Sequence, residues 1–423
     1  MAILEFIVYD VLGEASLLIG LMTLIGLIIQ KKPADKVISG TIKTIVGFLI
    51  FGIGSGAAVD ALSGFQTIFS TAFGLEGVTP IAEAITAQAQ TAFPMVIALI
   101  MVFGFVCNLI IARFTKFKYI FLTGGHSLFL SAFLAVMLKA LGLSDVMAIV
   151  IGSILHGLSA AIFPAIAQKS MNAVTGSDEI AIGHYCTTAY ALSGWIGSKV
   201  GDPKDSTEKI KLPGWLSIFK DYIVSVSLSI GIFYYVSAFV AGPAAVEAIS
   251  GGTHWLVYPL MQTLKFTGGL YVIITGVRLF LGEIVPAFVG ISEKLIPGAK
   301  PALDCPVVFP YAPTATVLGF ISAYAGGLLC MFIMAMMGST VIIPVAIPYF
   351  FIGATAGVFG NARGGWKGCV LGAFVTGILI AVGPALVYPL MTSVGLSGTC
   401  FPETDFNLLG IVFNAIGKVL GKW

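Results

Sequence analysis

Two histidines stand in glycine-containing stretches of an otherwise apolar sequence. His126 follows a pair of glycines, and His184 lies in an Ile-Gly-His-Tyr run at 182–185. An imidazole donates a hydrogen bond in either protonation state, which suits a neutral polyol or an anion as ligand. Each histidine could instead form a hydrogen bond between two helices, and the residues alone leave both interpretations open.

The two remaining histidines are interpreted as structural. His156 lies within an apolar helical run, where a buried imidazole commonly bonds to a neighbouring helix. His254 precedes Trp255, an aromatic anchor typical of the membrane interface.

Two acids, Glu83 and Asp304, occupy matching positions in the two halves of the chain. Each stands three residues after a proline, Pro80 or Pro301, and begins a short, weakly polar segment ahead of a long apolar one. Such segments are too short to cross a bilayer, so they predict two re-entrant hairpins in inverted repeats. We expect each acid either to accept hydrogen bonds from a substrate's hydroxyl groups or to cap a hairpin helix.

The elements that must position these residues are strongly apolar. Of the 423 residues, 58% are hydrophobic and 10% are charged, against roughly 25% charged in soluble proteins. A soluble domain could not bury this much apolar surface, so lipid must be part of the solvent. The sequence predicts an all-α polytopic membrane protein with about 11 transmembrane helices. The predicted spans are 17–30, 42–56, 94–111, 119–138, 146–163, 180–196, 222–241, 266–281, 312–336, 341–359 and 369–390.

Two amphipathic helices are expected to lie along the membrane interface, at 3–11 and 405–423. Orientation follows the lysines and arginines, which concentrate in cytoplasmic loops. We therefore place the N-terminus outside and the C-terminus in the cytoplasm. The basic residues fall in the segments 31–36, 113–118, 199–220, 363–367 and 418–422.

No cofactor, metal or catalytic set is predicted. The sequence has no P-loop, no Rossmann fingerprint, no H-E-x-x-H motif and no Ser-His-Asp order. None of the six cysteines forms a C-x-x-C pair. The net charge is +2 with no long basic stretch, so no nucleic-acid partner is expected.

A series of short blocks resembles the membrane-spanning IIC permease of the ascorbate-specific phosphotransferase system. Their order and number, rather than any single block, carry the resemblance. The blocks are GTIKTIVGF (40–48), GSG (54–56), LTG (122–124), IGH (182–184), KLPGWL (211–216), HW (254–255), GVRLF (276–280), LIPGA (295–299), DC (304–305), AP (312–313) and GGW (364–366).

The resemblance implies a homodimeric transporter of the bacterial inner membrane, not an enzyme in itself. It implies that L-ascorbate crosses by an elevator movement and is phosphorylated to ascorbate 6-phosphate by a partner IIB protein, supplied in turn by IIA. A scaffold at 1–75 and 222–296 would carry a mobile core at 76–200 and 297–395. The polar segment 198–221 would be a cytoplasmic linker.

The resemblance also implies a binding site. The family's binding positions fall on His126, Phe129, His184, Tyr185 and Asp304, with a further contact near Glu83. The sequence departs from the family pattern by an extra glycine before His126 and by tyrosine after His184, where glutamine is expected. The substitution near His184 keeps open a IIC permease for another polyol, such as a pentitol or galactitol. Two further alternatives are an ion-coupled sugar-acid symporter and an intramembrane enzyme.

Overall fold

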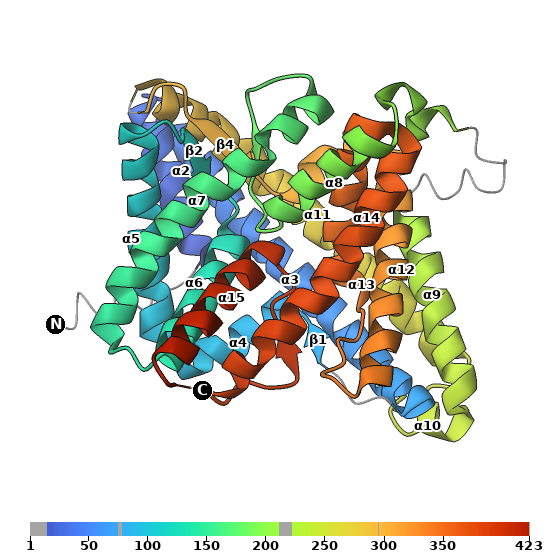
Figure 1. Cartoon of the computed structure of the whole chain (residues 1–423). Coiled ribbons are helices and arrows are strands. Elements are labelled where there is room, and N and C mark those ends of the chain that lie inside the picture. Colours follow the sequence, from blue (N-terminus) through green and yellow to red (C-terminus); the bar gives the residue numbers. More distant parts are fainter. Residues whose placement is uncertain (1–14, 75–77, 211–221, 295, 423) are drawn as a thin grey trace. The chain divides into compact units, whose positions relative to one another are not determined.

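The computed structural model describes residues 15–74, 78–210, 222–294 and 296–422, which are mainly helical (Figure 1). The chain divides into two compact units. Unit 1 is formed by residues 1–32, 78–210 and 285–423, and unit 2 by residues 33–77 and 211–284.

Several helices are long and apolar enough to cross a bilayer, which needs about 20 residues. Within the described residues five segments meet this condition: Ala34–Gly54, Pro94–Phe114, Asp145–Thr175, Pro313–Met337 and Tyr349–Thr392. Large apolar side chains on their surfaces remain exposed, as lipid contact requires, with Phe114 80% exposed and Met336 87% exposed. The protein is a multi-pass membrane protein.

Unit 2 is built from long helices. Its elements are α3 (Ala34–Phe73), α9 (Tyr222–Ala241), α10 (Pro243–Glu247) and most of α11 (Val257–Lys294). The hydroxyl of Tyr234 on α9 donates to the carbonyl of Ala61 on α3 at 2.7 Å. Lys43 on α3 pairs with Glu283 on α11 at 3.1 Å. These polar contacts connect α3 to α9 and α3 to α11 within unit 2.

Unit 1 holds the remaining helices. They are α2 (Ala15–Ile29), α4 (Ala82–Ala92), α5 (Pro94–Phe114), α6 (Gly124–Ala140), α7 (Asp145–Thr175), α8 (Thr187–Val200), η2 (Pro203–Asp205), η3 (Thr207–Lys209), η5 (Cys305–Tyr311), α12 (Pro313–Met337), α13 (Ala346–Pro348), the π-helix η6 (Tyr349–Gly353), α14 (Ala354–Thr392) and α15 (Thr404–Val419).

The helices α12 and α14 lie side by side (Figure 1) and approach so closely that a Cβ atom on Gly377 would lie 1.9 Å from the carbonyl oxygen of Ala323. Small residues allow such close contact where lipid surrounds the helices. Gly365, with φ of 60°, breaks α14.

Five short parallel strands lie between the helices of unit 1. A three-stranded sheet has the order β2 (Tyr119–Phe121), β4 (Lys300–Leu303), β3 (Ala181–Ile182). A second sheet pairs β1 (Thr79–Pro80) with β5 (Thr399–Cys400). Buried extended backbone needs hydrogen-bond partners for its polar groups, and the pairing of the strands supplies them.

The strands exchange partners between the two halves of the sequence. The second-half strand β4 pairs with the first-half strands β2 and β3. The first-half strand β1 pairs with the second-half strand β5, and Val78 before it bridges to Ile342. Each half therefore supplies one strand that is held by two segments of the other half.

Three of the predicted spans differ from continuous helices. The segment 119–138 starts as β2 before α6, and 180–196 starts as β3 before α8, which has only 14 residues. The segment 341–359 starts in extended backbone and continues through α13 and the π-helix. Hydropathy alone does not separate a short buried strand from a helix turn, because both are apolar.

Of the two predicted terminal helices, only the C-terminal one lies within the described residues. The segment 3–11 lies outside them, as does the part 211–221 of the predicted linker. At the C-terminus α15 occupies the predicted position, but it buries polar Asp405 and Asn407 and exposes apolar Val412 and Val419. The helix also buries Phe406 and Phe413, so it presents apolar side chains both to unit 1 and to its surroundings.

Candidate functional site

The three strands of the larger sheet each lead into one ionisable side chain. Asp304 follows β4 directly, His184 follows β3 after Gly183, and His126 lies in the first turn of α6 after β2. Because parallel strands end at the same edge of a sheet, their carboxyl ends bring these side chains together. The arrangement explains why residues so far apart in the sequence form one cluster.

Gly183 makes this convergence possible. Its N–H donates to the carbonyl of Leu303 at 2.6 Å. A Cβ atom at this position would lie 2.4 Å from the carbonyl oxygen of Ala302, so only glycine allows β3 to approach β4 so closely. The close approach places His184 beside Asp304.

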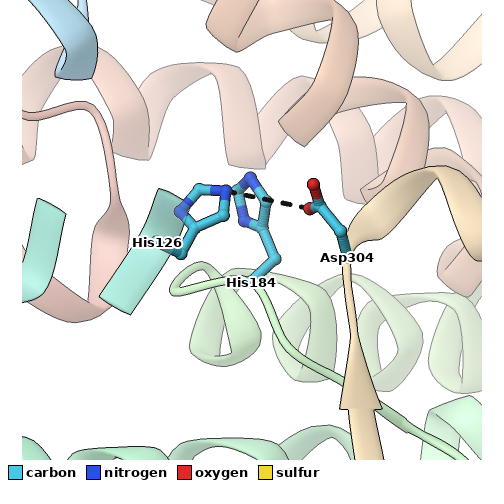
Figure 2. Close-up of side chains that lie close together, drawn as sticks. All are labelled: His126, His184 and Asp304. Carbon is cyan, nitrogen blue, oxygen red and sulfur yellow. Dashed lines mark ion pairs between the residues drawn. The ribbon is translucent and has the colours of Figure 1, made fainter. Parts of the chain in front are cut away.

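The cluster of His126, His184 and Asp304 is compact (Figure 2). Nε2 of His126 lies 3.7 Å from Oδ1 of Asp304, and the centroids of the two imidazole rings are 4.1 Å apart. His184 is 4% exposed, and the side chains of His126 and Asp304 are 12% and 14% exposed. One small surface therefore offers hydrogen-bond donors from two imidazoles and acceptors from a carboxylate.

Neighbouring side chains fix the orientation of the histidines. The hydroxyl of Tyr190 on α8 lies 3.0 Å from Nδ1 of His184. The ring of Phe129 packs edge-on against His126, with centroids 5.4 Å apart. The predicted site residues Phe129, His126, His184 and Asp304 are thus in one place.

Asp304 also has the capping role that the sequence left open. Its Oδ1 accepts the backbone N–H of Cys305 at 2.7 Å and caps η5. The same carboxylate faces His126. The two interpretations of this acid are compatible, because one carboxylate offers several lone pairs.

The structure assigns neither Tyr185 nor Glu83 a contact with the cluster among the residues it describes. The ring of Tyr185 is fully buried and stacks on Phe121 at 4.4 Å, with Phe406 also in contact. Glu83 lies in the first turn of α4, but its side chain is outside what the structure describes. Their role as substrate contacts stays a prediction.

Glu403, which follows β5, also lies near His126 but was not predicted from the sequence. Its carboxylate is 2% exposed, and its Oε1 lies 3.9 Å from Nδ1 of His126. A charged group buried in a membrane protein is costly and marks a functional candidate. The signal that could have found it is an acid shortly after an apolar run in the second half.

A second missed acid, Asp405, holds the backbone that carries His184. Its carboxylate accepts hydrogen bonds from the backbone N–H groups and the hydroxyls of Thr187 and Thr188, the first residues of α8. Its own N–H donates to the carbonyl of Tyr185 at 3.1 Å. The first turns of α15 and α8 are therefore locked together next to the site.

The other histidines lie outside the cluster. Nε2 of His156 lies 3.2 Å from the carbonyl oxygen of Ser127, a bond between α7 and α6 that confirms its structural interpretation. Nδ1 of His254 accepts the N–H of Leu256 at 3.2 Å.

Comparison with known proteins gives two similarities. Residues 10–405 match the family described as the sugar-specific permease component of the phosphotransferase system. The chain is also similar to a Mycoplasma pneumoniae protein named the ascorbate-specific PTS system EIIC component, with 29% identity over 425 residues. That alignment covers 87% of this chain and 64% of the relative, so the chain spans less than two thirds of the relative's length.

Proposed function

This chain belongs to the family of sugar-specific permease components of the phosphotransferase system, and we propose that its substrate is L-ascorbate. The name of the Mycoplasma pneumoniae relative supports ascorbate, and so does the chemistry of the site. The single observation that carries the proposal is the convergence of His126, His184 and Asp304 in one small, nearly buried cluster.

Each group in the cluster suits one part of ascorbate. Ascorbate is a monoanion at neutral pH, with its charge on the ring and hydroxyl groups on its side chain. The imidazole N–H groups of His126 and His184 donate to the charged ring oxygens. The carboxylate of Asp304 accepts from the side-chain hydroxyls.

The division of the chain into two units is compatible with the proposed transport mechanism. All three cluster residues belong to unit 1. This agrees with a mobile core drawn from 76–200 and 297–395. The proposed scaffold, with the homodimer interface, is drawn from 1–75 and 222–296, of which residues 33–75 and 222–284 belong to unit 2 and residues 1–32 and 285–296 belong to unit 1. In the proposed elevator movement the core carries the site across the membrane, and a IIB protein, recharged by IIA, phosphorylates ascorbate on the cytoplasmic side. The segment 198–221 is the proposed docking linker.

The proposed topology keeps about 11 spans and two re-entrant hairpins, with the N-terminus outside the bacterial inner membrane and the C-terminus in the cytoplasm. The partner exchange of β1 and β4 supports the inverted repeat, because each strand precedes a matching acid. In the first half β1 leads into α4 and α5, and in the second half β4 leads into η5 and α12.

A binding titration of the purified protein tests the substrate. Ascorbate, a pentitol and galactitol are titrated in parallel, and only ascorbate is expected to bind tightly. The variants His184→Gln and Asp304→Asn are expected to weaken ascorbate binding about 10- to 100-fold, because each disturbs a hydrogen bond in which one of the two groups is charged. His156→Gln, which alters a buried histidine bonded to Ser127, is the matched control and is expected to retain the parent affinity.

Two outcomes would contradict the proposal. Equal affinity for a neutral polyol would assign the chain to another member of the family. Uptake by vesicles that follows an ion gradient without phosphorylated IIB would instead indicate a symporter.

A further inference from the structure

The same cluster has the donor set of a transition-metal site. One nitrogen of His126, one nitrogen of His184 and one oxygen of Asp304 all lie within 4.8 Å of one another. Two ligand atoms bound tetrahedrally to one Zn²⁺ are roughly 3.4 Å apart, given a zinc–ligand distance of about 2.1 Å. The 3.7 Å separation of His126 Nε2 and Asp304 Oδ1 is close to this value and longer than an N–H···O hydrogen bond.

The second nitrogen of each imidazole faces a polar side chain. Nδ1 of His184 is engaged by the hydroxyl of Tyr190 at 3.0 Å, which leaves Nε2 for a ligand. Nδ1 of His126 faces Glu403 at 3.9 Å, and Nε2 faces Asp304. Histidines that bind metals typically hydrogen-bond through their other nitrogen. The Tyr190 hydroxyl fills this role for His184, whereas Glu403 lies near His126 at a distance longer than a hydrogen bond.

The donor types select the metal. Two imidazoles and one carboxylate favour Zn²⁺, Co²⁺ or Ni²⁺ over Mg²⁺ and Ca²⁺, which prefer oxygen ligands. Three protein ligands leave a fourth position for water, as in open zinc sites. The low exposure of the three side chains limits the number of additional ligands.

We propose that His126, His184 and Asp304 bind a divalent transition-metal ion, with Zn²⁺ as the representative ion, and that this ion and the sugar substrate exclude each other. The competition rests on the function proposed above, because the ion takes the same donor and acceptor atoms that the substrate uses. Zinc is then a reversible inhibitor of substrate binding, and a chelator restores it.

Titration of the full-length protein, freed of any affinity tag, with ZnCl₂ alone tests the ion site. The parent is expected to bind one Zn²⁺ per chain, and CoCl₂ is expected to give the visible absorption of a four- or five-coordinate ion. His184→Ala and Asp304→Asn are expected to weaken zinc binding at least 100-fold. Tyr190→Phe, which keeps every ligand, is expected to weaken it about 10-fold. His156→Gln is the control and keeps the parent affinity.

A competition experiment distinguishes failure of the ion site from failure of the ascorbate proposal. Ascorbate titrated at rising zinc concentration is expected to show a proportional increase in apparent Kd that EDTA reverses. Ascorbate binding that zinc leaves unchanged would overturn the competition while leaving the ascorbate proposal intact. Zinc binding that is lost in the ligand variants, in a protein that binds no ascorbate, would support the ion site and refute the substrate. Equal zinc affinity in the parent, His184→Ala and Asp304→Asn would overturn the ion site itself.

Discussion

Replacing Asp405 by asparagine is expected to destabilise the protein by about 2–4 kcal/mol. The carboxylate is fully buried. Its Oδ2 accepts the N–H and the hydroxyl of Thr187 at 2.9 and 2.8 Å, and its Oδ1 accepts the N–H of Thr188 at 3.0 Å together with the hydroxyl of Thr188. Asparagine keeps the shape, but in either orientation its NH₂ group faces one backbone N–H. The hydroxyls can rotate to accept, whereas the backbone N–H stays unsatisfied and the remaining bonds lose their charge.

Thermal and denaturant unfolding of the purified protein in detergent measure this loss. The matched control is Asp202→Asn, because Asp202 also accepts a backbone N–H, from Lys204 at 2.8 Å, but lies exposed at the start of a short helix. Water replaces that bond, so the control is expected to change stability by less than about 0.5 kcal/mol. A double-mutant cycle with Thr188→Val is expected to show a coupling of about 0.5–3 kcal/mol.

Ascorbate binding provides a second measurement on the same variant. The loop that carries His184 lies between β3 and the helix start that Asp405 caps, so Asp405→Asn is also expected to weaken binding. If Asp405→Asn unfolds within about 0.5 kcal/mol of the parent, or if Asp202→Asn is equally harmful, burial of the carboxylate does not determine its importance and the reasoning fails.

Three further predictions concern other contacts. Tyr190→Phe removes the hydroxyl that lies against the site histidine, which is worth about 1 kcal/mol, and a titration is expected to show substrate Kd about five-fold higher. Gly377→Ala is expected to lower the free energy of unfolding by about 1–3 kcal/mol or more, because its new Cβ atom would collide with the backbone of Ala323. Gly52→Ala is the control: no atom lies within 4 Å of its new Cβ atom, so a neutral or stabilising effect is expected. The unfolding midpoints of the two variants are compared with that of the parent. The hydrogen bond from Lys300 lowers the pKa of Asp178 in the folded protein. The ionised carboxylate therefore stabilises the fold above the unfolded pKa, and this stabilisation is lost as pH falls through the folded pKa. In Lys300→Ala, unfolding measured below pH ~5 is expected to show a decrease in free energy with falling pH that is smaller than the parent's by at most about 1 kcal/mol.

The sequence predicted the class of the protein well. Composition and hydropathy indicated a helical, multi-pass membrane protein, because lipid exposure imposes a strong and local signal on the sequence. The long apolar helices α5, α7, α12 and α14 occupy segments that were predicted as spans. The family resemblance is also confirmed by the match over residues 10–405.

The strands could not be predicted from the same signal. β2 and β3 are buried runs of two or three residues inside longer apolar segments, and their pairing with β4 depends on residues more than 100 positions away. Hydropathy is a local property and contains no information about such partners. The glycines were visible in the sequence, but only the structure shows that Gly183 is required by close backbone approach.

The residues of the candidate cluster could be predicted in part from the sequence. His126, His184 and Asp304 were found because an ionisable residue in an apolar context requires a partner. Glu403 is also an ionisable residue after an apolar run, but the strand β5 before it has only two residues and gives no recognisable repeat in the sequence. Tyr190 was missed because a tyrosine on an apolar helix gives no sign of where its hydroxyl points.

The exchange of strands between the halves also constrains biosynthesis. The hydroxyl of Thr79 bonds to the carbonyl of Gly398, 319 residues later in the chain. While the ribosome is still producing the second half, the segment at 78–80 has been made but its backbone partners have not. Until then these polar groups must bond to water or to other partners, because a buried backbone group without a hydrogen bond is costly. The β1–β5 sheet therefore forms only after residues 398–400 have been synthesised, and neither half can complete it alone.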